Sequence, residues 1–138
     1  MSSDTLFTAG CGRFFEGTPE EMDHSLNKVL ANLPKDTTVY NGHEYTGGNV
    51  KFALKVDPHN EFVLKLAKFV QDHSTTVGEF TIGDELNHNP FMRLSDPQIK
   101  LVNLTMIICF VNNSVRKATG QESSNEVMRV LREMKNRG

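Results

Sequence analysis

Apolar residues recur at helical spacing in the first third of the chain. The segment Thr18-Pro19-Glu20-Glu21 offers a threonine N-cap, a proline at the first helical position and a glutamate that completes a capping box. The apolar positions that follow share one helical face, and they are Met22, Leu26, Val29, Leu30 and Leu33. The pattern predicts an amphipathic helix that ends at Pro34.

Two short runs with strand-like composition flank this helix. Residues 5–9 lead into the sequence GCG, where glycines allow backbone angles that other residues avoid. Residues 36–40 are β-prone and stop at the sequence NG. Strand, helix and strand in this order predict a βα unit of a layered α/β fold, with the loop GHEYT at the end of the second strand.

Helical patterns replace strand patterns beyond residue 49. Asp57-Pro58, and Ser123 with Glu126, are typical of helix starts. Apolar residues at helical spacing follow the first start at Phe62, Val63, Leu66, Phe69 and Val70, and the second at Val127, Val130, Leu131 and Met134.

The chain therefore divides into an α/β piece, residues 1–48, and a helical piece, residues 49–138. Two short strands and one helix cannot cover both faces of a sheet. We expect the α/β piece to be completed by sequence that is missing here or by another chain.

Composition is that of an ordinary globular protein, with 38% hydrophobic and 23% charged residues among 138. The formal net charge of −2 gives no overall attraction to nucleic acid or to an anionic membrane, so we expect neither as a partner. Residues 115–138 are locally basic, which we interpret as a solvated helix face. Its cations are Arg116, Lys117, Arg129, Arg132, Lys135 and Arg137.

The cysteines and the apolar runs argue against disulfide-rich, zinc-knuckle and membrane-spanning proteins. Cys11 and Cys109 form no CxxC pattern, so neither a disulfide framework nor a zinc knuckle is indicated and a reducing compartment fits best. The N-terminal sequence has no signal or transit pattern. The most apolar run, residues 101–111, is shorter than the roughly twenty residues of a membrane span and predicts a buried element.

Asp4 and His43 are candidate metal ligands, because each follows or adjoins a predicted strand end, where distant residues meet. A carboxylate and an imidazole suit zinc, iron or manganese. The alternative is that Asp4 marks a strand boundary and His43 is an ordinary loop residue. Of the remaining histidines, His24 falls off the apolar stripe of its helix. The others, His59, His73 and His88, are interpreted as cap or surface residues.

Three sequence blocks resemble one family when they are taken in order. DTLFTAGCGRFFEGT, GHEYT and NPFMR are similar to hydroxyacylglutathione hydrolases, the glyoxalase II family of the metallo-β-lactamase superfold. The resemblance implies that residues 1–48 are the last part of an αββα layered domain and that residues 49–138 form a helical substrate-binding domain. It also implies a binuclear metal centre of zinc, iron or manganese, ligated in part by Asp4 and His43. The other ligands of the family lie in an upstream THxHxDH block and a further histidine, which this sequence lacks.

The same resemblance implies a set of glutathione-binding residues. They are Arg13, Phe15, Tyr45, Arg93 and, with a weaker local match, Lys100. Arginine suits glutathione because its guanidinium meets a carboxylate in a bidentate fork. Phe15 stands where the family commonly has tyrosine, and it lacks the hydroxyl that would make one hydrogen bond to the substrate. The alternative is that Arg13 and Arg93 are ordinary surface arginines.

The function implied is metal-dependent hydrolysis of S-D-lactoylglutathione-type thioesters to glutathione and a 2-hydroxy acid, as in methylglyoxal detoxification. No catalytic residue is expected beyond the metal ligands, and without the remaining ligands we expect this chain alone to be inactive. The alternative is a non-enzymatic module that binds glutathione conjugates or a protein partner, and association with a full-length homologue is a further option. We expect a cytoplasmic location, although a longer product could carry a mitochondrial leader. Residues 98–114 are more apolar than the family pattern and are interpreted as an insertion without an evolved role.

Overall fold

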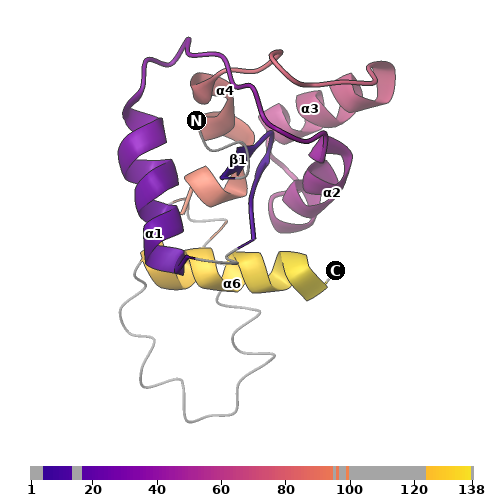
Figure 1. Ribbon diagram of the computed structural model, residues 1–138. Coiled ribbons are helices and arrows are strands. Elements are labelled where there is room, and N and C mark those ends of the chain that lie inside the picture. Colours follow the sequence, from indigo (N-terminus) through magenta and orange to yellow (C-terminus); the bar gives the residue numbers. More distant parts are fainter. Residues whose placement is uncertain (1–4, 14–16, 95, 97–98, 100–123, 138) are drawn as a thin grey trace.

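The computed structural model describes residues 5–13, 17–94, 96, 99 and 124–137. This part of the chain is mostly helical, with one small antiparallel sheet at its centre (Figure 1). Strand β1, Leu6–Phe7, pairs with strand β2, Gly10–Cys11. The strand predicted for residues 5–9 is thus a tight hairpin that turns back at Ala9, whose φ of 57° lies in the left-handed region.

The first predicted helix is present but not uniform. Helix α1, Pro19–Asp23, continues as a π-helix, His24–Val29, and a 3-10 turn, Leu30–Asn32. The predicted capping box is confirmed, since the Thr18 hydroxyl accepts from the Glu21 amide and the Glu21 carboxylate accepts from the Thr18 amide. The helical stretch stops before Pro34, as the sequence predicts.

The strand predicted for residues 36–40 is wrong. This segment forms a single antiparallel bridge between Thr38 and Thr81. The Val39 amide donates to the carbonyl of Phe80 at 2.8 Å, and the Ile82 amide donates to the carbonyl of Thr37 at 2.9 Å. These bonds satisfy the backbone groups without a regular strand. The pairing stops there because a helix begins at residue 82. The metallo-β-lactamase-like layering of residues 1–48 remains a prediction.

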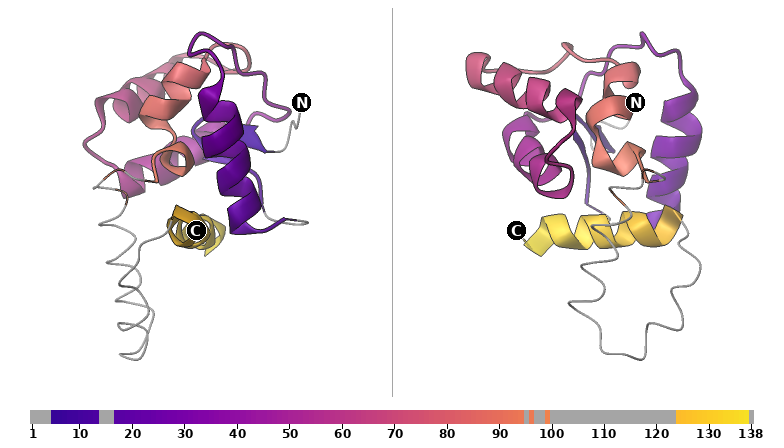
Figure 2. Two further views of the ribbon diagram at one scale, coloured as in Figure 1. Left: turned by 90° about the vertical axis from the view of Figure 1, so that its left-hand side faces the viewer. Right: turned by 180° about the vertical axis from the view of Figure 1, so that it is seen from behind.

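Four further helices complete the described part of the chain (Figures 1 and 2). They are α2, Thr46–Val56; α3, Glu61–Asp72; α4, Ile82–His88; and α6, Ser124–Arg137, with a 3-10 turn at Pro90–Met92. Helix α6 runs across one end of the other helices in Figure 1, with α1 meeting it near its start, and the left-hand view of Figure 2 looks along the axis of α6.

Two helix starts differ from the sequence prediction. Helix α3 is capped by Asn60, whose side-chain oxygen accepts from the amides of Phe62 and Val63, and not by Asp57. The Asp57 carboxylate is engaged elsewhere, because Arg93 and Asn60 donate to it. Helix α4 was not predicted, although Thr81 and Asp84 form a complete capping box at its start.

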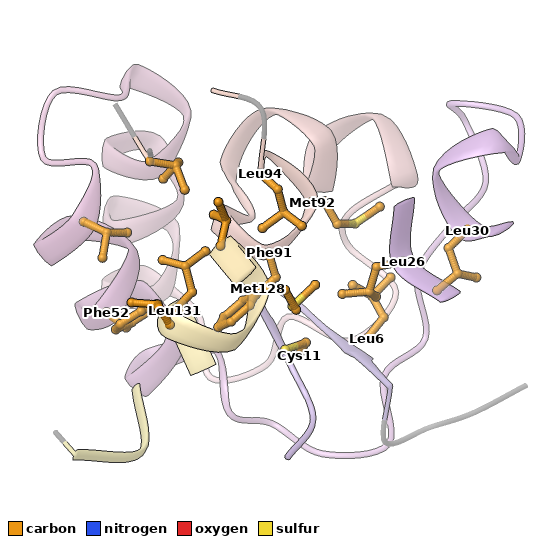
Figure 3. Close-up of a cluster of buried hydrophobic side chains, with 14 of the residues drawn as sticks. Leu6, Cys11, Leu26, Leu30, Phe52, Phe91, Met92, Leu94, Met128 and Leu131 are labelled. Atoms are coloured by element: carbon orange, nitrogen blue, oxygen red, sulfur yellow. The ribbon is translucent and has the colours of Figure 1, made fainter. Parts of the chain in front are cut away.

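Both predicted pieces contribute to one hydrophobic core. Leu6 and Leu26 from the first piece pack with Phe91, Met128 and Leu131 from the second (Figure 3). The predicted boundary at residue 48 falls inside helix α2. The division into two domains is therefore still a prediction, while residues of both pieces share the larger of two buried apolar clusters.

A buried carboxylate holds the hairpin turn in place. Glu85 is 0% exposed, and its carboxylate accepts from the Ala9 amide at 3.0 Å, from Asn89 at 2.9 Å and from His88 at 3.0 Å. The side-chain amide of Asn89 also donates to the carbonyl of Gly10 at 3.0 Å. The interpretation of His88 as a surface residue is wrong, because the pairing with Glu85 places its ring at 3% exposure in the interior.

The predicted buried element at residues 101–111 and the predicted cap at Ser123 lie outside the described residues. So does the segment 98–114, apart from residue 99. In the part that is described, no helix is long and apolar enough to cross a membrane.

Gly10 provides a test of how tightly the hairpin packs on helix α2. A Cβ atom at Gly10 would lie 2.6 Å from the side-chain amide of Asn49, whereas one at Gly47 would meet nothing within 4 Å. We predict that Gly10→Ala lowers the free energy of unfolding by about 1–3 kcal/mol, the usual cost of overpacking.

Gly47→Ala is the matched control and should be neutral or stabilising by up to about 1 kcal/mol, because alanine favours the helix. Urea denaturation of both variants measures the difference. Equal stabilities for the two variants would contradict the close approach.

Candidate functional site

A cavity of about 1080 Å³ lies where the end of the hairpin, the start of helix α2 and the last turns of helix α6 come together. Arg13 lines it directly after strand β2, Tyr45 lines it at the N-terminus of α2, and Arg132 and Lys135 line it from α6. Residues far apart in sequence thus form one basic, partly aromatic wall.

Hydrogen bonds to the loop at residues 41–46 hold the aromatic part of the wall. The side-chain amide of Asn41 donates to the carbonyl of His43 at 2.8 Å. The Glu44 carboxylate accepts from the backbone amide of Thr76 at 3.1 Å and from its hydroxyl at 2.6 Å. The rings of His43 and Tyr45 stack, with centroids 5.1 Å apart and planes at 17°. Phe7 packs edge-on against Tyr45, so strand β1 fixes the position of both rings.

Arg132 anchors helix α6 to the hairpin. Its Nη1 atom donates to the carbonyl of Cys11 at 2.7 Å, and its Nε and Nη2 atoms donate to Asn136 at 3.0 and 2.7 Å. The side chain is only 6% exposed. The interpretation of the basic C-terminal segment as a solvated helix face is therefore wrong for Arg132.

A signal for this arrangement is present in the sequence. Met128, Leu131, Arg132 and Lys135 are spaced so that they share one face of α6, and the first two are fully buried. A cation that lies on the apolar stripe of a helix must be partnered or must line a cavity.

Burial perturbs two ionisable groups of the wall. Burial and then the charge of Arg132 lower the pKa of Lys135 to about 8. Two weaker effects act in opposite directions, because Cys11 raises this pKa and Arg13 lowers it. Burial raises the pKa of Cys11 to about 11, against the lowering effect of Arg132 and Lys135. At neutral pH the lysine is therefore a cation and the cysteine is an unreactive thiol.

The structure brings together three of the residues singled out in the sequence, and Arg13, His43 and Tyr45 all line the cavity. Arg93 does not line it. Its guanidinium is bound at 2.5 Å by Asp57 and at 2.7 Å by Asp96, beside a different hollow. Asp4, Phe15 and Lys100 lie outside the described residues, and their roles remain predictions.

The described residues do not fit a binuclear metal centre. Across residues 5–13, 17–94, 96, 99 and 124–137, no three His, Cys, Asp or Glu side chains are grouped so that they could hold a metal ion. His43 lines the cavity mainly among aromatic, glycine and cationic neighbours. Among the described residues, Glu44 is a carboxylate that also lines the cavity, and it accepts hydrogen bonds from Thr76. Further donors for a metal ion would have to come from other residues.

Comparison with known proteins gives a consistent match. The profile of the family described as the hydroxyacylglutathione hydrolase C-terminus matches residues 44–138. A probable hydroxyacylglutathione hydrolase of Schizosaccharomyces pombe is 47% identical over 136 residues, which are 99% of this chain and 46% of the relative.

Two proteins of Saccharomyces cerevisiae show the same relation. The cytoplasmic isozyme of its hydroxyacylglutathione hydrolase is 44% identical over 149 aligned residues, covering 99% of this chain and 48% of the relative. The mitochondrial enzyme is 38% identical, covering 99% of this chain and 47% of the relative. The chain thus spans about half the length of the curated relatives that it matches.

The perturbed pKa values predict how stability depends on pH. Between about pH 8 and the ordinary lysine pKa of 10.5, the unfolded state binds more protons at Lys135 than the folded state, so stability rises with pH. Above the ordinary cysteine pKa of 9.0, Cys11 acts in the opposite sense, because its folded pKa is about 11.

We therefore expect the free energy of unfolding to rise between about pH 8 and 9 and to level off above that. Urea denaturation across this range should show the rise in the wild type and in Lys65→Met, and not in Lys135→Met. A rise that persists in Lys135→Met would assign it to another group.

Proposed function

Because this chain belongs to the hydroxyacylglutathione hydrolase family, we propose that its cavity binds the glutathione portion of an S-D-lactoylglutathione-type thioester. The observation that supports this most directly is the convergence of Arg13, Arg132 and Lys135 on one cavity that Tyr45 also lines. Glutathione offers two carboxylates to these cations, and a partly buried site weakens screening of the attraction.

Each residue of the wall has a distinct part in this proposal. Arg132 is held by Cys11 and Asn136 and presents a fixed positive charge, whereas Lys135 presents a compact ammonium group beside it. Arg13 is exposed and can close over the ligand from the hairpin side. Tyr45 is 53% exposed, so its ring and hydroxyl are accessible to the peptide part of glutathione.

The hydrolytic step is a separate part of the proposal. We propose that residues 1–48 are the last part of a metallo-β-lactamase-like domain and that residues 49–138 are the substrate-binding domain. Asp4 and His43 would then be two ligands of a zinc, iron or manganese centre whose other ligands are supplied by further sequence. A polypeptide of residues 1–138 is proposed to bind glutathione and not to hydrolyse the thioester.

Calorimetry with glutathione at pH 7 tests the binding site. We expect the wild-type chain to bind and Lys135→Met to bind about tenfold more weakly, since a hydrogen bond to a charged group contributes about 1.5–3 kcal/mol. Lys65→Met is the matched control, because Lys65 lies over the ring of Phe62 on helix α3, outside the cavity wall. Equal affinities for wild type and Lys135→Met would contradict the proposed role of the cavity.

An assay of S-D-lactoylglutathione hydrolysis tests the requirement for further metal ligands. The purified chain should show no turnover above background in the presence of zinc, iron or manganese, while glutathione still gives heat in the calorimeter. Metal-dependent turnover by residues 1–138 alone would overturn this part of the proposal.

A further inference from the structure

Asn49 connects the three elements that enclose the cavity. It lies in helix α2, is 2% exposed and lines the cavity. Its Nδ2 atom donates to the carbonyl of Thr8 in the hairpin turn at 3.0 Å. Its Oδ1 atom accepts from the Nζ atom of Lys135 on helix α6. Gly10 packs directly on the same amide, so the side chain has little freedom to move.

The chemistry of the two partners fixes the orientation of this amide. A carbonyl oxygen needs a donor, and an ammonium group needs an acceptor. The reversed orientation would face oxygen against oxygen and N–H against N–H. Asn49 therefore presents its oxygen to Lys135 in the folded chain.

A neutral amide has an effect that a carboxylate would not have. It restrains the ammonium group of a long, flexible side chain, which otherwise samples many rotamers. It does so without cancelling the positive charge. The ring of Phe91, 5.8 Å from the same Nζ atom, adds a second restraint of this kind.

We propose that Asn49 is a positioning residue that holds the Lys135 ammonium at the cavity wall, with its charge available to an anionic group of the ligand. The proposal rests on the proposed function in one respect, namely that the ligand is glutathione. Asn49 itself acts on Lys135 and on the hairpin, and Lys135 meets the anion.

The test combines Asn49→Ala with Lys135→Met in a double-mutant cycle, read by calorimetry with glutathione at pH 7. Alanine removes the acceptor that holds the ammonium group and adds no charge, while the lost hydrogen bond to Thr8 is common to both backgrounds. We expect Asn49→Ala to bind glutathione about tenfold more weakly than the wild type, and to cause much less further loss in the Lys135→Met background. Equal losses in both backgrounds would show that Asn49 affects only the fold, and would overturn the proposal.

A second readout does not depend on the ligand. Arg132, Arg13 and Cys11 are the other ionisable groups that act on Lys135, and its pKa is about 8 in their presence. Asn49→Asp should raise that pKa, because a carboxylate stabilises the ammonium form. NMR titration of the Lys135 side chain measures it. An unchanged pKa would overturn the contact on which the proposal is built.

Asn87→Asp is the matched control, since it adds the same charge at an exposed position outside the cavity wall. It should leave both glutathione affinity and the pKa of Lys135 unchanged. The two readouts also separate this proposal from the proposed function. A raised Lys135 pKa in Asn49→Asp, together with no heat from wild type and glutathione, would refute the glutathione site and leave the positioning contact standing.

Discussion

The arrangement of the cavity depends on the buried carboxylate of Glu85. A carboxylate at 0% exposure costs several kcal/mol unless donors surround it, and Ala9, His88 and Asn89 supply them. The amide of Ala9 can reach this carboxylate only because the chain turns there with a positive φ. The hydrogen bond from the Ala9 amide to Glu85 thus offsets the strain of a non-glycine residue in the left-handed region.

The hairpin, held in place by Glu85, in turn positions helices α2 and α6 through hydrogen bonds to its backbone. Its turn presents the carbonyl of Thr8 to Asn49, and its second strand presents the carbonyl of Cys11 to Arg132. Helix α6 is in this way tied to the hairpin by a hydrogen bond from the Arg132 side chain to the backbone of Cys11, in addition to apolar packing. The core supplies the larger part of the stability, whereas these polar contacts select one register of α6 against the hairpin.

Local features of the fold could be predicted from the sequence, and long-range ones could not. The capping box at Thr18 and the stop before Pro34 follow from neighbouring residues alone. Helix α4 carries an equally local signal in the capping box of Thr81 and Asp84. The β-prone residues 36–40 lack a strand because strand formation needs a partner, and among the described residues they form one isolated bridge. Arg132 looked like a surface cation because its partner, the carbonyl of Cys11, is 121 positions away.

The cavity wall brings like charges close together, and this has a consequence for function. Burial most, and then Arg132 and Arg13, disfavour the charged form of Lys135 and lower its pKa. A bound anion would offset the repulsion between these cations. Asn49 can hold the ammonium group in place but cannot neutralise it. A site built in this way favours a ligand that brings carboxylates over a neutral one of the same shape, because only the former removes the repulsion.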